Sequence, residues 1–358
     1  MGEPCGNAGT GQRVVKVKEM TLEIGDQDVL LVTGATGLVG SHVALAARQR
    51  GLSVRALVRE SSETEVLEQA GVELVRGDMT RADTLSEAVR DVSLIVHCAA
   101  KVGDWGATDD YRKVNVDALA TLVDAAQATQ TLRRFVQISS LGVYEARDHH
   151  GTDETEQVNR SGIDGYTLTK LESEQVVQRA WSDQQFPAII LRPGFIYGPR
   201  DRTVLPRLLE KLKSGQFAYL GSTEKVMNNT YVDNLCEAVF RALESDGLCG
   251  EVYNIRDDRL VSKQEFVETI ARHAGASLPK KRVPLPVARG LASVLESVWK
   301  LLGKQEAPIL SKARIKFLGL NLDYSIDKAK RELGYTGAID FQDGMEATLI
   351  WFRDHGKL

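Results

Sequence analysis

A chain of 358 residues is long for a single hydrophobic core and suits one large domain with a smaller part appended, or two domains. Its apolar fraction of 43% and net charge of −4 are ordinary for a soluble globular protein, and no block of Lys or Arg favours nucleic acid as a partner. The four cysteines lack C-x-x-C spacing and the six histidines form no ligand cluster, so neither a disulfide framework nor a metal site is expected.

The N-terminal segment 1–27 contains Gly, Pro and charged residues but no apolar run, so we expect a flexible tail without a secretory signal. No run of about 18 apolar residues occurs in the chain, so we expect no membrane span. Scattered cysteines without a pairing pattern are typical of reduced intracellular thiols. Together these features predict a cytoplasmic protein.

The first predicted element is an apolar strand at 29–32, followed by three glycines, Gly34, Gly37 and Gly40, and by an amphipathic pattern over 38–50. This order predicts a strand, a tight turn and a helix. The turn needs a residue that tolerates positive φ, and a diphosphate can approach the backbone only where no Cβ intrudes. The last glycine is expected to let the helix pack close to the sheet. The helix N-terminus offers free N–H groups and partial positive charge to phosphates.

Apolar strands then alternate with amphipathic helices as far as Pro193. The predicted strands are 53–58, 72–75, 94–98, 135–138 and 188–192, and the predicted helices are 64–69, 82–89, 110–128 and 166–181. Such alternation indicates βαβ units, and therefore a parallel sheet with helices on both faces. Because crossovers are right-handed, we expect a doubly wound α/β fold of the Rossmann type.

After Pro193 the pattern changes to short strands and helices interrupted by prolines. The predicted elements are helices at 205–213, 233–243, 263–273, 288–302 and 346–354 and a strand at 252–255. We interpret this part as a smaller α/β substrate-binding lobe. The predicted division is a dinucleotide-binding domain at 28–192, with 228–257 crossing back to it, and a lobe made of 193–227 and 258–358.

The end of the second strand bears on cofactor choice. Rossmann proteins that prefer NAD carry a carboxylate there, which binds the adenosine ribose hydroxyls. Here Val58 takes that place and Arg59 follows, and a guanidinium has fork geometry that suits a 2′-phosphate. This favours NADP(H) over NAD(H). The alternative is that Arg59 is an ordinary surface residue and Glu60 binds the ribose.

Three side chains form the candidate catalytic set, Ser140, Tyr166 and Lys170. Tyr166 and Lys170 stand at i and i+4 on one helix face, and Ser140 follows the strand before that helix. A free phenol has a pKa near 10, which a neighbouring ammonium and an oxidised nicotinamide would lower toward the working range. Lys170 would also hold the nicotinamide ribose, and Ser140 would donate to the substrate oxygen. The small residues Ala99 and Ala100, after the fourth strand, would let a dinucleotide lie across the strand ends.

The motifs T-G-x-x-G-x-x-G at 33–40, Y-x-x-x-K at 166–170 and R-P-x-x-x-Y-G-P at 192–199 have the spacing found in one enzyme family. The chain resembles the extended short-chain dehydrogenases over about 29–354, and is most similar to their branch of 3β-hydroxysteroid dehydrogenases and dihydroflavonol reductases. The resemblance favours Ser140 over Ser139 as the catalytic serine.

The resemblance also implies the cofactor contacts. Asp78 would accept from the adenine amino group with help from the backbone of Met79, although a helix N-terminal acid is an equally ordinary reading of Asp78. The backbone around Pro193 would border the nicotinamide amide, and Asn115 would support the site. The implied dinucleotide-binding residues are Gly34, Thr36, Gly37, Leu38, Val39, Arg59, Asp78, Met79, Ala99, Ala100, Tyr166, Lys170 and Pro193.

The activity that the resemblance implies is reversible alcohol–ketone chemistry on an apolar sterol-, flavonoid- or acyl-like substrate. Hydride would pass between nicotinamide C4 and the carbonyl carbon, while Tyr166 transfers the proton and Ser140 polarises the oxygen. One alternative is a nucleotide-sugar epimerase or dehydratase, against which the missing acid at Val58 counts. Another is a cofactor sensor without turnover, although such relatives usually lose the Tyr or the Lys. The sequence leaves the substrate and the reaction direction open.

Two further segments give indications about the substrate pocket and about possible contact surfaces. Trp105, in the loop 101–106 after the fourth strand, would either wall an apolar pocket or anchor the loop. The segment 284–303 is amphipathic, which favours a lobe helix packed on the core. A minority interpretation of 284–303 is a contact with a membrane surface or with a second copy in a homodimer.

Overall fold

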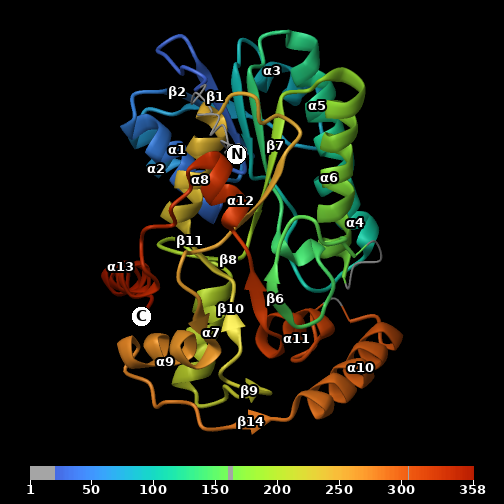
Figure 1. Ribbon diagram of the computed structural model, residues 1–358, viewed down its shortest axis with the longest axis vertical. Coiled ribbons are helices and arrows are strands. Elements are labelled where there is room, and N and C mark those ends of the chain that lie inside the picture. Colours follow the sequence, from blue (N-terminus) through green and yellow to red (C-terminus); the bar gives the residue numbers. More distant parts are fainter. Residues whose placement is uncertain (1–20, 160–163, 305) are drawn as a thin grey trace, which may run out of the picture.

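The computed structural model describes residues 21–159, 164–304 and 306–358. Its centre is a seven-stranded parallel sheet of order β12-β7-β5-β4-β1-β2-β3, with helices on both faces (Figure 1). The strands are β1 (Val29–Thr33), β2 (Ser53–Val58), β3 (Glu73–Arg76), β4 (Leu94–His97), β5 (Arg134–Ile138), β7 (Ala188–Pro193) and β12 (Val252–Ile255). The predicted doubly wound α/β fold is confirmed. All carboxyl ends of these strands meet at one edge, where such folds bind ligands.

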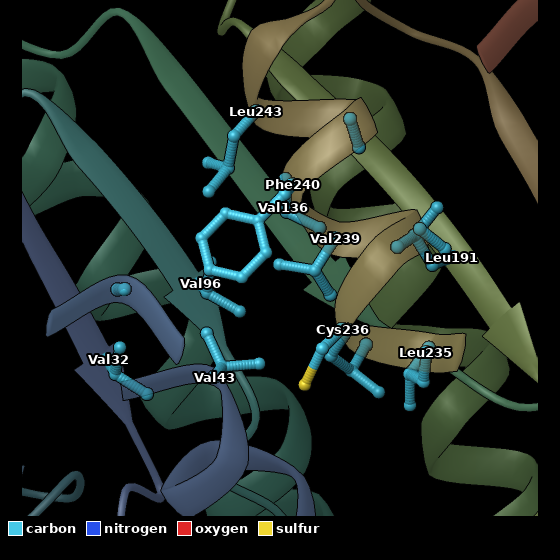
Figure 2. Close-up of a cluster of buried hydrophobic side chains, with 14 of the residues drawn as sticks. Val32, Val43, Val96, Val136, Leu191, Leu235, Cys236, Val239, Phe240 and Leu243 are labelled. Carbon is cyan, nitrogen blue, oxygen red and sulfur yellow. The ribbon is translucent and has the colours of Figure 1, made fainter. Parts of the chain in front are cut away.

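Successive side chains of each strand point to opposite faces of the sheet, and helices cover both faces. On β1, Leu30 and Val32 enter one core and Leu31 enters the other. The first core packs against α1 (Leu38–Gln49) and α8 (Val232–Glu244), as Figure 2 shows for α8. The second packs against α3 (Ala82–Ala88), α5 (Ala118–Thr129) and α6 (Gly165–Gln184). The small helix α2 (Glu65–Gln69) precedes β3.

The predicted helix at 110–128 is longer and less regular than expected. It begins as α4 (Thr108–Arg112), passes through a π-helical turn at Lys113–Asp117 and continues as α5. The turn contains Asn115, whose side chain is buried. Such turns are rare and are often found at functional sites, and hydrophobic spacing does not reveal them.

Most of the chain after β7, apart from α8 and β12, lies next to the carboxyl edge of the sheet as a smaller lobe (Figure 1). Near the sheet, β8 (Phe195–Tyr197) pairs with β11 (Asn229–Tyr231), and α7 (Val204–Lys213), α9 (Lys263–His273) and α13 (Phe341–Asp354) pack around them. Farther out lie β9 (Tyr219–Leu220), β10 (Val226–Met227), β13 (Val261–Ser262), β14 (Arg282–Val283), α10 (Leu285–Leu301) and α11 (Lys312–Gly319). The pair β6 (His149–Thr152) and β15 (Leu322–Tyr324) and the helix α12 (Asp327–Leu333) complete the lobe's connections to the sheet.

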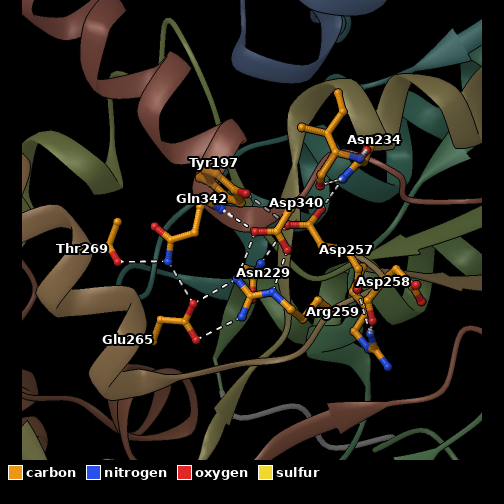
Figure 3. Close-up of polar contacts among 12 residues, drawn as sticks. Tyr197, Asn229, Asn234, Asp257, Asp258, Arg259, Glu265, Thr269, Asp340 and Gln342 are labelled. Atoms are coloured by element: carbon orange, nitrogen blue, oxygen red, sulfur yellow. Dashed lines mark hydrogen bonds and ion pairs between the residues drawn. The ribbon is translucent and has the colours of Figure 1, made fainter.

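A buried carboxylate joins the lobe to the sheet. Asp257, which follows β12, accepts hydrogen bonds from Asn229 Nδ2 (2.7 Å), Asn234 Nδ2 (2.8 Å), the Tyr231 amide (2.7 Å) and the Tyr197 hydroxyl (3.1 Å) (Figure 3). Burial raises the pKa of Asp257 to about 6, against these hydrogen bonds. Because the donors come from β8, β11 and α8, this carboxylate fixes the crossing segment against the edge of the sheet.

Three expectations need correction. Thr21 bridges to Ser245, and the side chains of Leu22 and Ile24 pack against the first core, so the expected flexible tail is wrong for 21–24; residues 1–20 lie outside the described residues. Within the range assigned to the lobe, Ile326, Ala329, Leu333 and Tyr335 instead belong to the sheet's core. The remaining division into domains stays a prediction.

The third correction concerns α10, which was expected to bury its apolar face on the core. Its fully buried side chains are only the small ones of Ala288 and Ala292. Leu285, Leu295 and Trp299 are half-buried, and the other large apolar side chains of the helix are exposed. Across the described residues, none of the helices has both the length and the hydropathy that a membrane crossing requires.

Candidate active site

The turn between β1 and α1 brings backbone atoms together more closely than any side chain allows. Gly34 has φ of +67°, and a Cβ there would lie 2.7 Å from the Ala99 nitrogen. A Cβ on Gly40 would lie 2.3 Å from the Gly34 carbonyl oxygen. The third glycine therefore lets the helix approach closely the turn at the carboxyl end of β1. Gly37 is the N-cap of α1.

This turn fits the diphosphate of a dinucleotide. Among the described residues, the first turn of α1 contains no acidic residue, and no side chain caps it. Its first backbone N–H groups are therefore not bonded by a capping side chain, and the helix dipole gives this end a partial positive charge. Thr36, Leu38 and Val39 are half-buried there. Leu38 packs against the lobe and Val39 against the sheet's core, so the turn lies where the two parts meet.

Gly40→Ala is expected to lower the free energy of unfolding by about 1–3 kcal/mol, because the Gly34 carbonyl must move to admit the methyl group. Affinity for a nicotinamide dinucleotide should fall at least about tenfold, because the moved carbonyl belongs to the turn that is expected to hold the diphosphate. The matched control is Gly290→Ala on α10, where no heavy atom of the described residues lies within 4 Å of the added Cβ. Urea unfolding and fluorescence titration measure both. Equal behaviour of the two variants would contradict this account of the turn.

The adenosine end of the predicted site gathers positive charge. Arg59 is exposed just past β2, and its carbonyl accepts from Arg76 Nη1 at 3.3 Å. Asp78 Oδ1 accepts from the Thr80 amide (2.8 Å) and hydroxyl (2.7 Å), which lowers the pKa of Asp78, and the charges of Arg59 and Lys113 lower it further. The structure thus brings Arg59 and Asp78 together, with Asp78 engaged in its own turn. Lys113 comes from the π-helical turn and was not predicted.

Other predicted cofactor positions lie along the same edge. The Ala99 amide donates to the Thr33 hydroxyl at 3.3 Å, and the same hydroxyl is 2.8 Å from His97 Nδ1. Ala100 is half-buried beside it, Met79 packs on the second core and Pro193 ends β7. These residues border a path across the carboxyl ends of β4 and β7, as expected for an extended dinucleotide.

Ser140, Tyr166 and Lys170 come together at the end of β5. Ser140 begins the short turn Leu141–Val143, and its hydroxyl accepts from the Gly142 amide at 2.9 Å. The Tyr166 hydroxyl lies close enough to the Ser140 side chain for Ser140 to lower the pKa of the phenol. Lys170 Nζ lies 6.0 Å from the centre of the Tyr166 ring and donates to the Ile138 carbonyl at 2.7 Å. The three side chains therefore form one contiguous polar group.

Burial decides the protonation of this group. It raises the pKa of Tyr166 to about 12, with the nearby Asp164 acting in the same direction and the Ser140 hydrogen bond opposing. It lowers the pKa of Lys170 to about 8, with Glu174 opposing. In the free chain the pKa of the phenol is therefore raised by burial and lowered only by Ser140, and the expected lowering by the Lys170 ammonium is not among the causes. A protonated phenol beside a hydroxyl is suited to giving a proton to an oxygen atom.

A buried ion pair behind the site explains why Ser140 and not Ser139 faces Tyr166. The Ser139 hydroxyl donates to Glu174 Oε1 at 2.5 Å, and Arg192 donates to both Glu174 oxygens at 2.9 and 2.7 Å. Arg192 also donates to the Tyr144 hydroxyl at 2.8 Å. Glu174 was not predicted, although it stands one helical turn after Lys170 on the same face of α6.

Asn115 connects two elements of the site. Its Oδ1 accepts from the Lys101 amide at 2.7 Å, and its Nδ2 donates to the Lys101 carbonyl (3.1 Å) and to Thr169 Oγ1 (3.0 Å). The π-helical turn therefore fixes the loop after β4 to the helix residue that precedes Lys170. This contact accords with the supporting role that the resemblance implied.

Residues of the lobe contact the loop after β4 and the turn after Ser140. Trp105 Nε1 donates to the Lys304 carbonyl at 2.9 Å, and Asp104 pairs with Arg314 at 2.7 Å, which favours the anchoring interpretation of Trp105. From α11, Lys316 Nζ donates to the carbonyls of Gly142 (2.7 Å) and Tyr144 (2.5 Å). Lys316 therefore holds the turn after Ser140, and nothing in its local sequence pattern indicated that role.

Comparison with known proteins adds four findings. Residues 30–255 match the NAD dependent epimerase/dehydratase family. The chain is 30% identical over 318 residues, 88% of its length and 94% of the relative's, to a 4-hydroxy-2-methyl-3-oxo-4-farnesyl-3,4-dihydroquinoline-1-oxide ketoreductase of Stigmatella aurantiaca. It is also 30% identical over 346 residues to a 3 beta-hydroxysteroid dehydrogenase/Delta 5→4-isomerase of Mycobacterium tuberculosis, covering 93% and 92% of the two chains. The crystal structure of gox2253 superposes with a TM-score of 0.77 and 30% identity, covering 92% of this chain and 99% of that one.

Proposed function

Because this chain belongs to the NAD-dependent epimerase/dehydratase family, we propose that it is an oxidoreductase that interconverts a secondary alcohol and a ketone on an apolar substrate. The observation that carries the proposal is the placement of the Tyr166 phenol beside Ser140, with Lys170 Nζ 6.0 Å from the centre of the Tyr166 ring. The named activities of the ketoreductase and the hydroxysteroid dehydrogenase support the substrate class. In this account Ser140, Tyr166 and Lys170 are the catalytic residues.

Each catalytic side chain has one task. A bound nicotinamide supplies or accepts the hydride. Ser140 accepts from the Gly142 amide, so its own hydrogen remains free to be donated to the substrate oxygen. Tyr166, protonated in the free chain, gives its proton to the same oxygen during reduction and takes it back during oxidation. Lys170 donates to the Ile138 carbonyl and has further N–H groups for a ribose hydroxyl.

The activity is tested by following NADPH absorbance with a panel of sterol, flavonoid and acyl ketones. We expect oxidation of NADPH with at least one apolar ketone. An epimerase, the alternative within the family, would instead convert a nucleotide sugar without net loss of NADPH. Turnover of UDP-sugars together with no oxidation of NADPH by any ketone would overturn the proposal.

We assign the preferred cofactor as NADP(H), with NAD(H) as the weaker ligand. Val58 stands where a ribose-binding acid would be, and the exposed Arg59 and the nearby Lys113 provide positive charge beside Asp78. A 2′-phosphate placed there would gain charge-assisted hydrogen bonds that a 2′-hydroxyl cannot match.

Arg59→Ala is expected to weaken NADPH binding by about 10- to 100-fold, because a hydrogen bond to a charged group is worth about 1.5–3 kcal/mol. NADH binding should change little, because it has no 2′-phosphate. Fluorescence titration of both nucleotides measures the change. The control is Arg331→Ala, which removes an exposed arginine paired with Glu332. If both nucleotides weaken equally in Arg59→Ala, the assigned phosphate contact is wrong.

A further inference from the structure

Helix α10 presents large apolar side chains to solvent. Six of them are between 40% and 86% exposed, namely Val287, Leu291, Val294, Val298, Leu301 and Leu302. Their spacing of three and four residues places them on one side of the helix. The opposite side, with Ala288 and Ala292, packs with Ile315 and Leu220. The apolar surface of this helix is therefore left over after the lobe has formed its own core.

The position of α10 makes this surface accessible. The helix lies at the outer end of the lobe, beyond α11 and far from the sheet (Figure 1). At about 1.5 Å per residue, its 17 residues form a rod about 25 Å long. Contiguous exposed apolar surface of this kind marks a contact site for a protein or a membrane.

Charge distinguishes these two occupants. The exposed basic residues Lys280, Lys281 and Arg282 precede α10, and the exposed Lys300 and Lys304 lie at its C-terminal end. Lys312 pairs with Glu296 of the helix, and the exposed Glu306 is an acidic residue just beyond the end of the helix. Both ends of the helix are thus positive. Pairing α10 with the same helix of a second copy would bring basic ends near each other in either orientation, which costs free energy. An anionic lipid surface would instead neutralise both ends.

We propose that α10 lies in the surface of an anionic lipid bilayer, with its apolar side chains among the acyl chains and its basic ends at the headgroups. The segment after α10 contacts the loop after β4. Trp105 Nε1 donates to the Lys304 carbonyl, and Arg314 donates both to Asp104 and to the Ile309 carbonyl. Val102 in that loop and Ile309 are each 69% exposed. Bilayer contact here would bring membrane-dissolved apolar substrates to the loop after β4; this last step rests on the proposed function.

The test is co-sedimentation of the full chain with phosphatidylcholine vesicles that contain about 30% phosphatidylglycerol, compared with pure phosphatidylcholine. The wild-type chain should bind the anionic vesicles and should be released by high salt, because screening weakens the basic contacts. The triple variant Leu291→Ser/Val294→Ser/Val298→Ser should bind at least about tenfold less tightly. The charge variant Lys280→Glu/Lys281→Glu should also lose binding.

The matched control is Val66→Ser/Ile350→Ser, which removes apolar side chains that are each 44% exposed on α2 and α13, and should bind vesicles like the wild type. Equal binding of the triple variant and the wild type, or no binding by the wild type, would overturn the proposal. So would a wild-type dimer in sedimentation velocity that the triple variant dissociates. NADPH titration of every variant separates the two proposals, because lost vesicle binding with intact NADPH binding leaves the proposed function standing.

Discussion

Replacing Tyr166 by Phe is expected to lower kcat about 10²- to 10⁴-fold, the usual contribution of a positioned acid–base group. The change removes only the hydroxyl that contacts Ser140 and keeps the ring, whose centre lies 6.0 Å from Lys170 Nζ. Packing and the dinucleotide path should therefore be preserved, and NADPH affinity should stay unchanged. Steady-state kinetics with the best ketone of the panel and fluorescence titration measure the two effects.

The control for this variant is Tyr253→Phe, which removes another buried phenol, one that contacts Glu332 at 3.1 Å on the edge strand β12. It should keep wild-type kcat. Ser140→Ala should lower kcat as well, with unchanged NADPH affinity, because the substrate oxygen loses its second donor. Wild-type turnover by Tyr166→Phe would show that the proton is transferred by another group.

Replacing Arg192 by Met is expected to lower the free energy of unfolding by about 3–5 kcal/mol, because it leaves a buried carboxylate without its partner. Glu174 and Arg192 have side chains only 1% and 6% exposed, and two hydrogen bonds of 2.9 and 2.7 Å join them. The pair links α6, which carries Tyr166 and Lys170, to β7 at the cofactor edge. Chemical denaturation with far-UV circular dichroism measures the loss.

Two variants make this prediction specific. Arg331→Met removes an exposed arginine paired with Glu332 and should cost less than about 1 kcal/mol. The double variant Arg192→Met/Glu174→Leu should recover part of the loss, because apolar replacement of a buried pair is often tolerated. The recovery is incomplete because Ser139 and Tyr144 lose their partners. A double variant no more stable than Arg192→Met would show that the buried charge is not the cause.

The sheet was predictable because its signals are local. Most strands of the parallel sheet are short, largely apolar segments, and the turn after β1 needs glycine for reasons visible in a few residues. The lobe was less predictable. The helices α11 and α12 and the paired strands β9 and β14 depend on partners far away in the sequence. The apolar face of α10 was visible in the sequence, but amphipathicity does not say what covers such a face.

In the candidate site, too, some residues could be predicted from local sequence and others could not. Tyr166 and Lys170 were identified from their spacing together with the glycine motif, and Ser140 from the resemblance to the dehydrogenase family; the structure places the three near one another. Lys113 and Lys316 have no local signal, because they reach the site only through the π-helical turn and through α11. Likewise, the role of Gly40 follows from a contact with Gly34 that exists only in the folded turn.

The most direct test of the account is a crystal structure of the chain grown with NADP⁺. The account predicts the diphosphate at the N-terminus of α1, the 2′-phosphate beside Arg59, and the nicotinamide ring facing Ser140 and Tyr166. Lys170 should bond a hydroxyl of the nicotinamide ribose. A nicotinamide ring placed away from the Tyr166 hydroxyl, or a dinucleotide bound elsewhere on the chain, would contradict it.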